Sequence, residues 1–433
     1  MFRLADHIPW GGDARKAPCR HYTLGSKVPP EVAYSAPWFL KTSSIDRSPQ
    51  GTTVVGEFLA SAEAVAAGAE RVLASFRPDV VLMVNGLFTA EHVIRRIARQ
   101  QGIRVVTYEL SPTANALVFA QDEAASHRDT DALWRAVEDR PLTPAQEAEL
   151  DALLRSREQG TGTHLRYFGN VKGRGDEIRE ALGLRGARRV VSLFTNLSWD
   201  SAALGRNVAF PSMLDWVEAA CRAAAAARDT HLVVRVHPAE KRWGTREHVF
   251  DEVSVRLGGL PSNVRFVRPE EPLSSYALMD ISDLVLTYTS TVGLEAAARG
   301  RPVAVAGDAH YRSRGFTMDI SSPQDLHDAI TGEKVILPTD ESIARARRYA
   351  FAFFFRGNVP FPPVKVSDAL PVAVVEEPDA LLPGQDVYLD FICDRILHGG
   401  EFVLPVDVPH DSLPSDAEPS GETRPQPDRS GSM

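Results

Sequence analysis

Five short apolar runs alternate with helix-like segments in the second half of the chain, and this alternation constrains the fold more than any other feature. The runs are rich in Val, Leu, Phe and Ala, and they occur at residues 189–195, 231–236, 264–267, 284–288 and 302–306. The segments between them predict helices at about 210–228, 245–258, 272–280 and 290–299. Continuous apolar runs separated by helices are typical of strands buried on both faces. The pattern therefore predicts an α/β lobe with a doubly wound parallel sheet.

A shorter alternation of the same kind occurs in the first half. Residues 60–76 and 90–101 predict helices, and apolar runs at 79–84 and 103–110 predict two buried strands. The order strand, helix, strand forms one βαβ unit with parallel strands. A polar helix predicted at 143–158 then connects the two lobes.

The length of 433 residues exceeds one ordinary domain, so two packed lobes with appendages are expected. Further helices are predicted at 340–352 and 386–397, whereas the Pro-, Ser- and acid-rich end of the chain cannot build a core. The predicted organisation is an irregular segment (1–50), an N-terminal lobe (51–165), a C-terminal lobe (166–335), helices packing back across the lobes (336–404) and a disordered acidic tail (405–433).

Charge and cysteine content exclude several classes of protein. The formal net charge of −9 argues against nucleic acid as a partner, because a nucleic-acid binder needs a basic face. Three widely spaced cysteines indicate neither a disulfide framework nor a paired-cysteine zinc site. No apolar segment reaches the length of a signal peptide core or a membrane helix, so we expect a cytoplasmic location.

The start of the helix predicted at 290–299 is the first candidate binding site. Ser290 or Thr291 is a natural N-cap, and the free backbone N–H groups of a helix start attract phosphate. Glu295 lies one turn further along the same face, where it would meet ribose hydroxyls. The alternative is an ordinary capped helix in which Glu295 is a capping-box acid.

His237 is the second candidate, because it follows the strand at 231–236 and precedes Pro238. Proline ends the strand and keeps the preceding residue extended, so the imidazole is expected to face the mouth of the sheet and donate to a phosphate. Arg235 and Lys241 are expected to add positive charge nearby. The alternative is a polar surface histidine at the end of a strand.

The loop after the strand at 302–306 is the third candidate, because loops at this edge of the sheet commonly determine specificity. It contains Tyr311, Gly315 and Thr317 among several basic residues, and the alternative is a solvated basic loop.

Polar residues at three other strand ends form the last group of candidates. Asn196 and Asp200 follow the first strand of the C-terminal lobe, and Asn85-Gly86 and Glu109 occupy equivalent positions in the N-terminal lobe. Asp200 and Glu109 are candidates for accepting a proton from an incoming hydroxyl. Each of these acids has the alternative of a helix cap or a buried hydrogen-bonding acid.

Two tempting motifs lack the context that their usual functions require. Asp129-Thr130-Asp131 matches the metal-binding motif of many sugar transferases, but it lies in a polar helical stretch rather than at a strand end. The glycine-rich segment 169–175 has no strong strand before it, as a dinucleotide-binding loop would. We therefore expect neither a metal nor a cofactor.

Three motifs in the C-terminal lobe resemble those of the bacterial capsule polysaccharide biosynthesis family. They are His237-Pro238, the turn 290–295 followed by Gly-Arg-Pro-Val at 300–303, and Tyr311-x-x-x-Gly315-Phe-Thr317. Asn85-Gly86 and Glu109 resemble the N-terminal pattern of the family. The family includes transferases of 3-deoxy-manno-octulosonic acid (Kdo) and has the GT-B fold, in which two Rossmann-type lobes face a cleft.

The resemblance implies roles for individual residues. His237 and Ser290-Thr291 would hold the nucleotide phosphate, and Glu295 would meet the sugar part of the nucleotide. A complete GT-B N-terminal lobe has several strands, whereas only two are clear here, so a reduced N-terminal lobe is expected.

The resulting functional prediction is a metal-independent glycosyltransferase. It would move a sugar from a nucleotide-activated donor, such as a CMP-Kdo-like molecule, to a surface polysaccharide or glycolipid acceptor. The alternatives are transfer of a polyol phosphate from a CDP-linked donor, epimerisation of a UDP-sugar, and a non-catalytic scaffold of a polysaccharide assembly complex. A lipid-linked acceptor would imply peripheral attachment at the inner face of the membrane.

Overall fold

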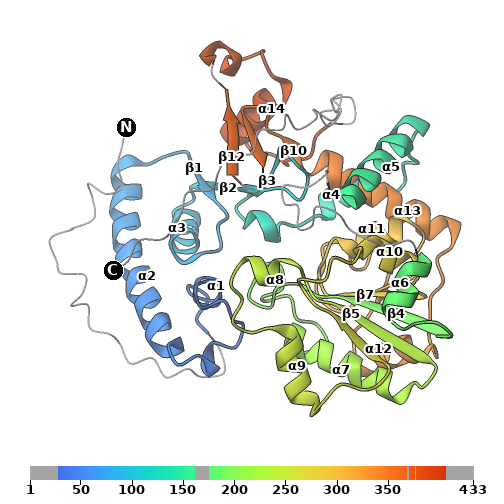
Figure 1. Ribbon diagram of the computed structural model, residues 1–433. Helices are drawn as coiled ribbons and strands as arrows, with labels where there is room; N and C mark the ends of the chain where they lie inside the picture. The colour runs from blue at the N-terminus through green and yellow to red at the C-terminus, as the bar shows by residue number, and fades with distance from the viewer. Residues whose placement is uncertain (1–27, 161–174, 368–369, 376, 406–433) are drawn as a thin grey trace, which may run out of the picture.

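The computed structural model describes residues 28–160, 175–367, 370–375 and 377–405. The predicted acidic tail beyond residue 405 and most of the glycine-rich segment 169–175 lie outside the described residues. Figure 1 shows the N-terminal elements in blue at the left, the large sheet of the C-terminal lobe at the lower right and α14 at the top.

The C-terminal lobe is built on a six-stranded sheet with the order β6-β5-β4-β7-β8-β9. All neighbouring strands in this sheet pair in parallel. The strands are β4 (Arg189–Phe194), β5 (Thr230–Arg235), β6 (Val264–Val267), β7 (Leu284–Thr287), β8 (Val303–Val305) and β9 (Met318–Asp319). This topology confirms the predicted doubly wound parallel sheet, to which the structure adds the two-residue edge strand β9.

Successive side chains of the central strand β4 enter different cores on the two faces of this sheet. Val190 and Phe194 belong to one core, whereas Val191 and Leu193 belong to the other. One face carries α6 (Gly175–Ala181), α10 (Ser275–Asp280), α11 (Val292–Ala298) and α13 (Asp340–Phe351), and the other carries α7 (Met213–Ala226), α9 (Val249–Leu257) and α12 (Pro323–Thr331). Apolar burial on both faces explains why the strands are continuous apolar runs.

The N-terminal lobe contains a mixed four-stranded sheet with the order β1-β2-β3-β10. β1 (Val80–Val84) and β2 (Arg104–Leu110) are parallel and are joined by α3 (Thr89–Gln100), so the predicted βαβ unit is confirmed. β3 (Ala116–Gln121) and β10 (Val359–Pro360) add two antiparallel pairings that were not predicted. The lobe therefore has four described strands rather than two.

Helices cover the two faces of this smaller sheet unequally. α2 (Gly51–Phe76) and α3 pack on one face, and α14 (Val387–His398) packs on the other. The expectation that β1 is buried is wrong, because Leu82 and Val84 are 48% and 50% exposed. β1 is the edge strand, and these two residues lie on the face that is covered by α14 together with Phe402 and Leu404.

The expectation that residues 1–50 are irregular is also wrong for the part that the structure describes. α1 (Ser35–Leu40) and a 3₁₀ turn (Ile45–Arg47) pack against the start of α2. Short helices of this kind produce little periodicity, because most of their buried residues are neighbours in sequence.

Two connections run between the lobes. α5 (Pro144–Gln159), the predicted polar connecting helix, buries Leu150, Leu153 and Leu154 in the core of the C-terminal lobe. At its end, α13 continues into a π-helical turn (Ala352–Arg356), after which the chain enters the N-terminal lobe as β10. The remaining elements are η4 (Ala125–His127), α4 (Asp131–Arg135), α8 (Ala239–Arg242), β11 (Val364–Ser367), β12 (Leu370–Val374) and η6 (Pro378–Leu381).

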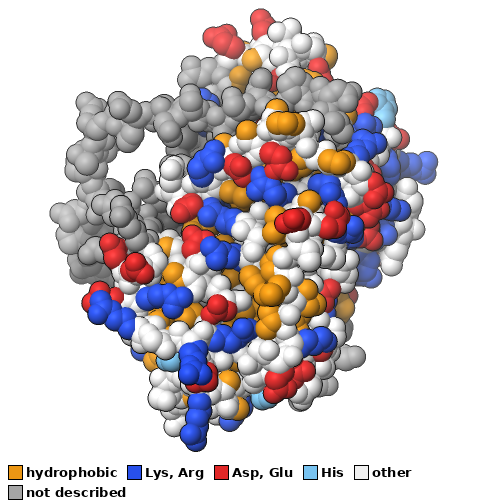
Figure 2. Space-filling model, turned by 90° about the vertical axis from the view of Figure 1, so that its right-hand side faces the viewer, with side chains coloured by type: hydrophobic (Ala, Val, Ile, Leu, Met, Phe, Trp, Pro, Cys, Tyr) orange, Lys and Arg blue, Asp and Glu red, His pale blue; other side chains and the backbone are white. Residues whose placement is uncertain are grey.

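Basic and acidic side chains are interspersed on the face of the molecule shown in Figure 2, and hydrophobic side chains lie between them. Among the described residues, no helix combines the length and the apolar character needed to cross a membrane.

Candidate functional site

A cavity of about 590 Å³ lies between the lobes, at the carboxyl ends of the strands. Its wall includes residues from the end of β2 and from the loops that follow β4, β5, β7 and β8. In that order of elements, they include Glu109, Asp200, His237, Thr291 and Asp308. Open α/β sheets bind ligands at this edge, because loops and helix starts meet there. The geometry thus places candidates from both lobes around one space.

Two hydrogen bonds hold His237 and its imidazole ring in place. Its Nδ1 accepts the backbone N–H of Ala239 at 3.1 Å, and its own backbone N–H donates to Thr195 Oγ1 at 3.0 Å. Burial lowers the pKa of His237 to about 4, and the charge of Arg235 acts in the same direction. The ring is therefore neutral near pH 7, with its proton on Nε2, which makes Nε2 a hydrogen-bond donor.

Neither basic residue predicted beside His237 lines this cavity. Arg235 is 2% exposed and donates from Nη1 to the backbone oxygen of Arg268 at 2.8 Å, and its charge lowers the pKa of His237. Lys241 lies on a separate cavity of about 490 Å³ together with Glu240. The expectation that both residues add charge at the site is therefore wrong for Lys241, whereas the charge of Arg235 does act on His237.

The start of α11 contributes to the cavity through Thr291. Thr291 is the N-cap residue, but its hydroxyl forms no capping hydrogen bond. Ser290 is not among the described residues of the cavity wall; its Oγ accepts the backbone N–H of Val292 at 3.4 Å and its backbone oxygen accepts the hydroxyl of Tyr311 at 2.6 Å. Of the two predicted phosphate-binding residues, the structure places Thr291 at the cavity.

Glu295 does not point into the cavity, so this expectation is wrong. Its side chain is 1% exposed, and Oε1 accepts Nε and Nη2 of Arg157 at 3.0 and 2.9 Å. Oε2 accepts the hydroxyl of Tyr276 at 2.6 Å. Both carboxylate oxygens are thus satisfied inside the protein, and Glu295 acts as neither a ribose ligand nor a capping-box acid in this structure.

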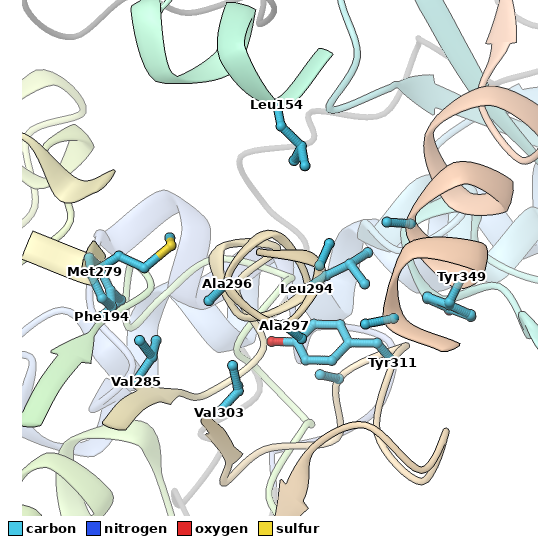
Figure 3. Close-up of a cluster of buried hydrophobic side chains, with 14 of the residues drawn as sticks. Leu154, Phe194, Met279, Val285, Leu294, Ala296, Ala297, Val303, Tyr311 and Tyr349 are labelled. Carbon is cyan, nitrogen blue, oxygen red and sulfur yellow. The ribbon is translucent and has the colours of Figure 1, made fainter. Parts of the chain in front are cut away.

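Tyr311 lies under α11 rather than on a solvated loop. Its side chain is fully buried, and its hydroxyl lies 3.0 Å from Thr287 Oγ1. Figure 3 shows α11 end-on, with the ring of Tyr311 below Leu294 and with Leu154 of α5 pointing toward the helix from above. The specificity role predicted for Tyr311 is therefore replaced by a structural one.

Gly293 allows this close packing. A Cβ at Gly293 would lie 2.3 Å from the hydroxyl oxygen of Tyr311 and 2.7 Å from Thr287 Oγ1. We expect Gly293→Ala to lower the free energy of unfolding by about 1–3 kcal/mol, as overpacking of a core does. Urea denaturation measures this loss, and Gly293→Ala combined with Tyr311→Phe, which removes the nearest clashing atom, should recover part of it. If Gly293→Ala alone left the free energy of unfolding unchanged, the close contact between Gly293 and Tyr311 would be contradicted.

The other predicted loop residues also lie away from the cavity wall. Gly315 has a φ of +80° and packs against Arg345, and Thr317 donates from Oγ1 to Asp319 at 2.9 Å. Asn196 accepts the backbone N–H of Thr289 at 3.4 Å. The same loop nevertheless reaches the cavity through Asp308, Ala309 and His310.

Glu109 and Asp200 are the two acids predicted as proton acceptors, and both line the cavity from opposite lobes. Burial raises the pKa of Glu109, and the charge of Asp200 raises it further against hydrogen bonds from Asn85 and Ser126. Burial also raises the pKa of Asp200, whereas hydrogen bonds from Ala202 and Ser201 and the charge of Lys41 lower it. Two acids in one partly buried space cannot both ionise easily.

Asn85 and Gly86 support Glu109 from behind rather than lining the cavity. Asn85 has a φ of +61°, its Oδ1 accepts the backbone N–H of Leu87 at 2.7 Å, and its Nδ2 donates to Glu109 Oε2 at 3.1 Å. Gly86 has a φ of +81°, and a Cβ there would lie 2.8 Å from a methyl group of Thr107. The Asn-Gly turn therefore fixes the orientation of the Glu109 carboxylate.

Sequence reasoning missed three arginines of the cavity wall, Arg128, Arg157 and Arg206. Arg157 also donates from Nη1 to the backbone oxygen of Pro112 at 2.8 Å, and so joins the N-terminal lobe to Glu295 of the C-terminal lobe. Arg206 pairs with Asp308 at 3.1 Å. Single arginines in loops and connecting helices give no periodic signal, so the sequence could not single them out.

His310 and Phe353 close another side of the cavity. Their rings stack with centroids 4.0 Å apart, and burial lowers the pKa of His310 to about 3, so this ring is neutral. The discounted segment 129–131 reaches the wall through Thr130, while Asp131 pairs with Arg314 at 2.6 Å. Among the described residues, no group of three or more His, Cys, Asp or Glu side chains is placed to hold a metal ion.

The fold and the cavity define a two-lobed α/β protein with an interlobe site. Residues 196–337 match the model of the family described as capsule polysaccharide biosynthesis protein. This segment contains all three motifs on which the predicted resemblance depends, and the resemblance is confirmed over these residues.

Solved structures of similar proteins include two transferases and an epimerase. The chain is 15% identical to Thermosulfurimonas dismutans KpsC, described as a β-Kdo 2,4-transferase, with coverage of 63% of this chain and 79% of that one and a TM-score of 0.40. For the β-Kdo 2,7-transferase of the same KpsC, the identity is 13%, the coverage 70% and 85%, and the TM-score 0.39. For a Neisseria meningitidis UDP-GlcNAc 2-epimerase bound to UDP-GlcNAc, the identity is 13%, the coverage is 78% of this chain and 82% of that one, and the TM-score is 0.32. No curated protein sequence matches the chain significantly.

Proposed function

We propose that this protein is a glycosyltransferase that uses a nucleotide-activated sugar in the synthesis of a surface polysaccharide. The observation that carries the proposal is the convergence of His237 and Thr291 from the family-matched segment with Glu109 from the other lobe on one interlobe cavity. A cavity of about 590 Å³ is of the size that small-molecule ligands occupy. The acceptor is a glycan or glycolipid, and we propose that the reaction takes place in the cytoplasm, at the inner face of the membrane where the acceptor is lipid-linked.

The donor phosphate is proposed to lie against the C-terminal lobe. The Nε2–H of neutral His237 would donate to a phosphate oxygen, and the guanidinium groups of Arg128 and Arg206 would compensate its negative charge. As the bond between the anomeric carbon and the phosphate oxygen breaks, charge on the leaving phosphate increases. Donors that are already oriented stabilise this charge without reorganising, which is the main catalytic contribution of such sites. This arrangement requires no metal ion.

The acceptor hydroxyl is proposed to approach from the N-terminal lobe. Its oxygen forms the new bond to the anomeric carbon, and its proton passes to one of the two carboxylates, Glu109 or Asp200. Closing the lobes around both substrates would exclude water, which otherwise competes with the acceptor as a nucleophile.

A second candidate function is a nucleotide-binding scaffold without transfer activity. The burial of Glu295 against Arg157 and Tyr276 favours it, because the carboxylate that would meet the nucleotide sugar is already satisfied. Incubation with a panel of nucleotide sugars followed by product analysis separates the candidates. New glycosidic products support transfer, an isomerised donor indicates epimerisation, and an unchanged donor with retained binding indicates a scaffold.

Nucleotide binding is the first testable consequence. We expect CMP, CDP or UDP to raise the melting temperature, because a ligand at one hundred times its Kd stabilises the folded state by about 2.7 kcal/mol. Arg206→Met should weaken this shift by removing a cation from the cavity wall. Lys241→Met, which removes a cation from the separate cavity, is the matched control. If none of the three nucleotides produces a shift, the assignment of the cavity to a nucleotide fails.

A further inference from the structure

The loop after β4 also lines a second polar cavity, which has a volume of about 490 Å³. The rest of its wall comes from the segment that precedes α2, the start of α7 and the end of α9. Four serines lie on this wall, namely Ser43, Ser44, Ser198 and Ser212. We call the cavity the serine pocket. Its volume is in the range that small-molecule ligands occupy.

A buried carboxylate orients three of these serine hydroxyls. Glu247 is 5% exposed, and its Oε2 accepts the hydroxyls of Ser43 and Ser198 at 2.6 and 3.0 Å. Its Oε1 accepts the hydroxyl of Ser44. The fourth serine donates its hydroxyl to Asp215 Oδ2 at 2.6 Å. A hydroxyl has only one hydrogen to donate, so all four oxygens face a ligand as hydrogen-bond acceptors.

The charges on the described wall of the serine pocket balance. Asp46 and Asp215 contribute two negative charges, and Arg47 and Arg256 contribute two positive ones. Arg256 pairs with Asp215 at 3.0 Å, and Arg47 pairs with Glu252 at 2.8 Å. Each guanidinium group has donors beyond the Nη1 atom that forms its ion pair. Two acids disfavour a phosphate, and two arginines disfavour a metal ion, so the wall favours a neutral ligand with many hydroxyls.

One loop connects the serine pocket with the interlobe cavity. Residues 200–202 and Arg206 line the interlobe cavity. Residues 203–205 and Asn207, which directly follow them in the chain, line the serine pocket. Because residues that are adjacent in sequence belong to different walls, the two cavities lie close together. One extended ligand could therefore contact both.

We propose that the serine pocket binds a neutral sugar residue of a glycan acceptor, next to the cavity in which the reacting hydroxyl lies. This inference rests on the proposed transferase function. Sugar hydroxyls supply the donors that the four serine oxygens and the two carboxylates accept, and the arginine N–H groups donate to other oxygens of the sugar. Binding a remote part of the acceptor holds its reacting end in the interlobe cavity.

Sugar binding tests the proposal without any transfer assay. The measurement is saturation-transfer difference NMR on the full-length protein without nucleotide, and the probes are glucose, galactose, mannose and N-acetylglucosamine. We expect at least one of these sugars to receive saturation from the protein. If none of the four does, the proposal is overturned.

The double variant Asp46→Ala, Arg47→Met assigns this binding to the serine pocket. Both side chains are exposed and the ion pair of Arg47 lies on the surface, so the variant should fold normally. Loss of hydrogen bonds to charged groups should weaken sugar binding by about tenfold or more. The control Asp280→Ala, Arg301→Met removes a similar pair outside both cavity walls and should bind like the wild type. Equal binding by Asp46→Ala, Arg47→Met and the wild type would place the sugar elsewhere and overturn the proposal.

Transfer assays separate this inference from the function on which it rests. With an acceptor of several sugar residues, Asp46→Ala, Arg47→Met should raise KM about tenfold and leave kcat nearly unchanged. With an acceptor of one sugar residue, its KM should equal that of the wild type. An unchanged KM for the longer acceptor contradicts the inference while the transferase proposal stands. If sugars bind in the serine pocket but no nucleotide sugar is consumed, the transferase proposal fails and the sugar site remains.

Discussion

Replacing His237 with asparagine is expected to reduce kcat by about 10²–10³-fold, the usual effect of removing one preorganised donor from an oxyanion-type site. The asparagine amide can still accept the backbone N–H of Ala239, as Nδ1 does in the native protein at 3.1 Å. It places no atom where Nε2 lies, so the proposed donor to the phosphate is lost while the local backbone contact is kept. Initial rates with saturating donor and acceptor measure the effect.

His237→Gln is the matched control for this prediction. Its longer side chain places an amide N–H near the position of Nε2, so it should recover part of the lost rate. Both variants should unfold within a few degrees of the wild-type protein, because most of the ring environment is unchanged. A fully active asparagine variant would contradict the proposed role, and an unfolded one would show that His237 is structural.

Breaking the buried ion pair between Arg157 and Glu295 is expected to have the largest effect on stability. The two side chains are 7% and 1% exposed, and their atoms approach to 2.9 Å. Arg157→Met leaves the carboxylate of Glu295 buried with only Tyr276 as a partner. Removing one partner of such a pair costs about 3–5 kcal/mol, because the other charge stays in a medium of low polarity. Urea denaturation followed by tryptophan fluorescence measures the loss.

The double variant Arg157→Met, Glu295→Gln provides the control. It removes both charges, and glutamine can still accept the hydroxyl of Tyr276, so it should be more stable than Arg157→Met alone. Glu295→Gln alone should be destabilised, since it leaves the guanidinium group without its anion. Equal stability of the single and double variants would contradict the assignment of this pair as a coupled unit.

The C-terminal sheet could be predicted because its strands are buried on both faces and therefore appear as continuous apolar runs. Elements whose pairing comes from distant residues could not be predicted in the same way. β10 is only Val359–Pro360, and it is a strand only because it pairs with Leu117 and Ala116 of β3. α12 did have local signals that were overlooked, with Ser322 as N-cap and a proline directly after it.

The candidate site shows the same division between local and distant determinants. The rule that ligands bind at strand ends correctly brought Glu109, Asp200 and His237 to one cavity, because chain direction alone determines which end of a parallel sheet they occupy. The prediction for Glu295 was wrong because its partner Arg157 lies 138 residues away in a helix that looked merely polar. Helical spacing specifies the face on which a side chain lies but not the partner that reaches it.

The return of the chain to the N-terminal lobe has a consequence for the order of synthesis. The last strand of the N-terminal sheet, β10, and the helix over its outer face, α14, both lie after residue 358. A ribosome therefore releases every strand and helix of the C-terminal sheet before the first lobe can acquire its final partners. The part of the chain that is made first is thus expected to be completed last, and chains truncated near residue 357, which include α13 but not β10, should resist proteolysis in their second half but not in their first.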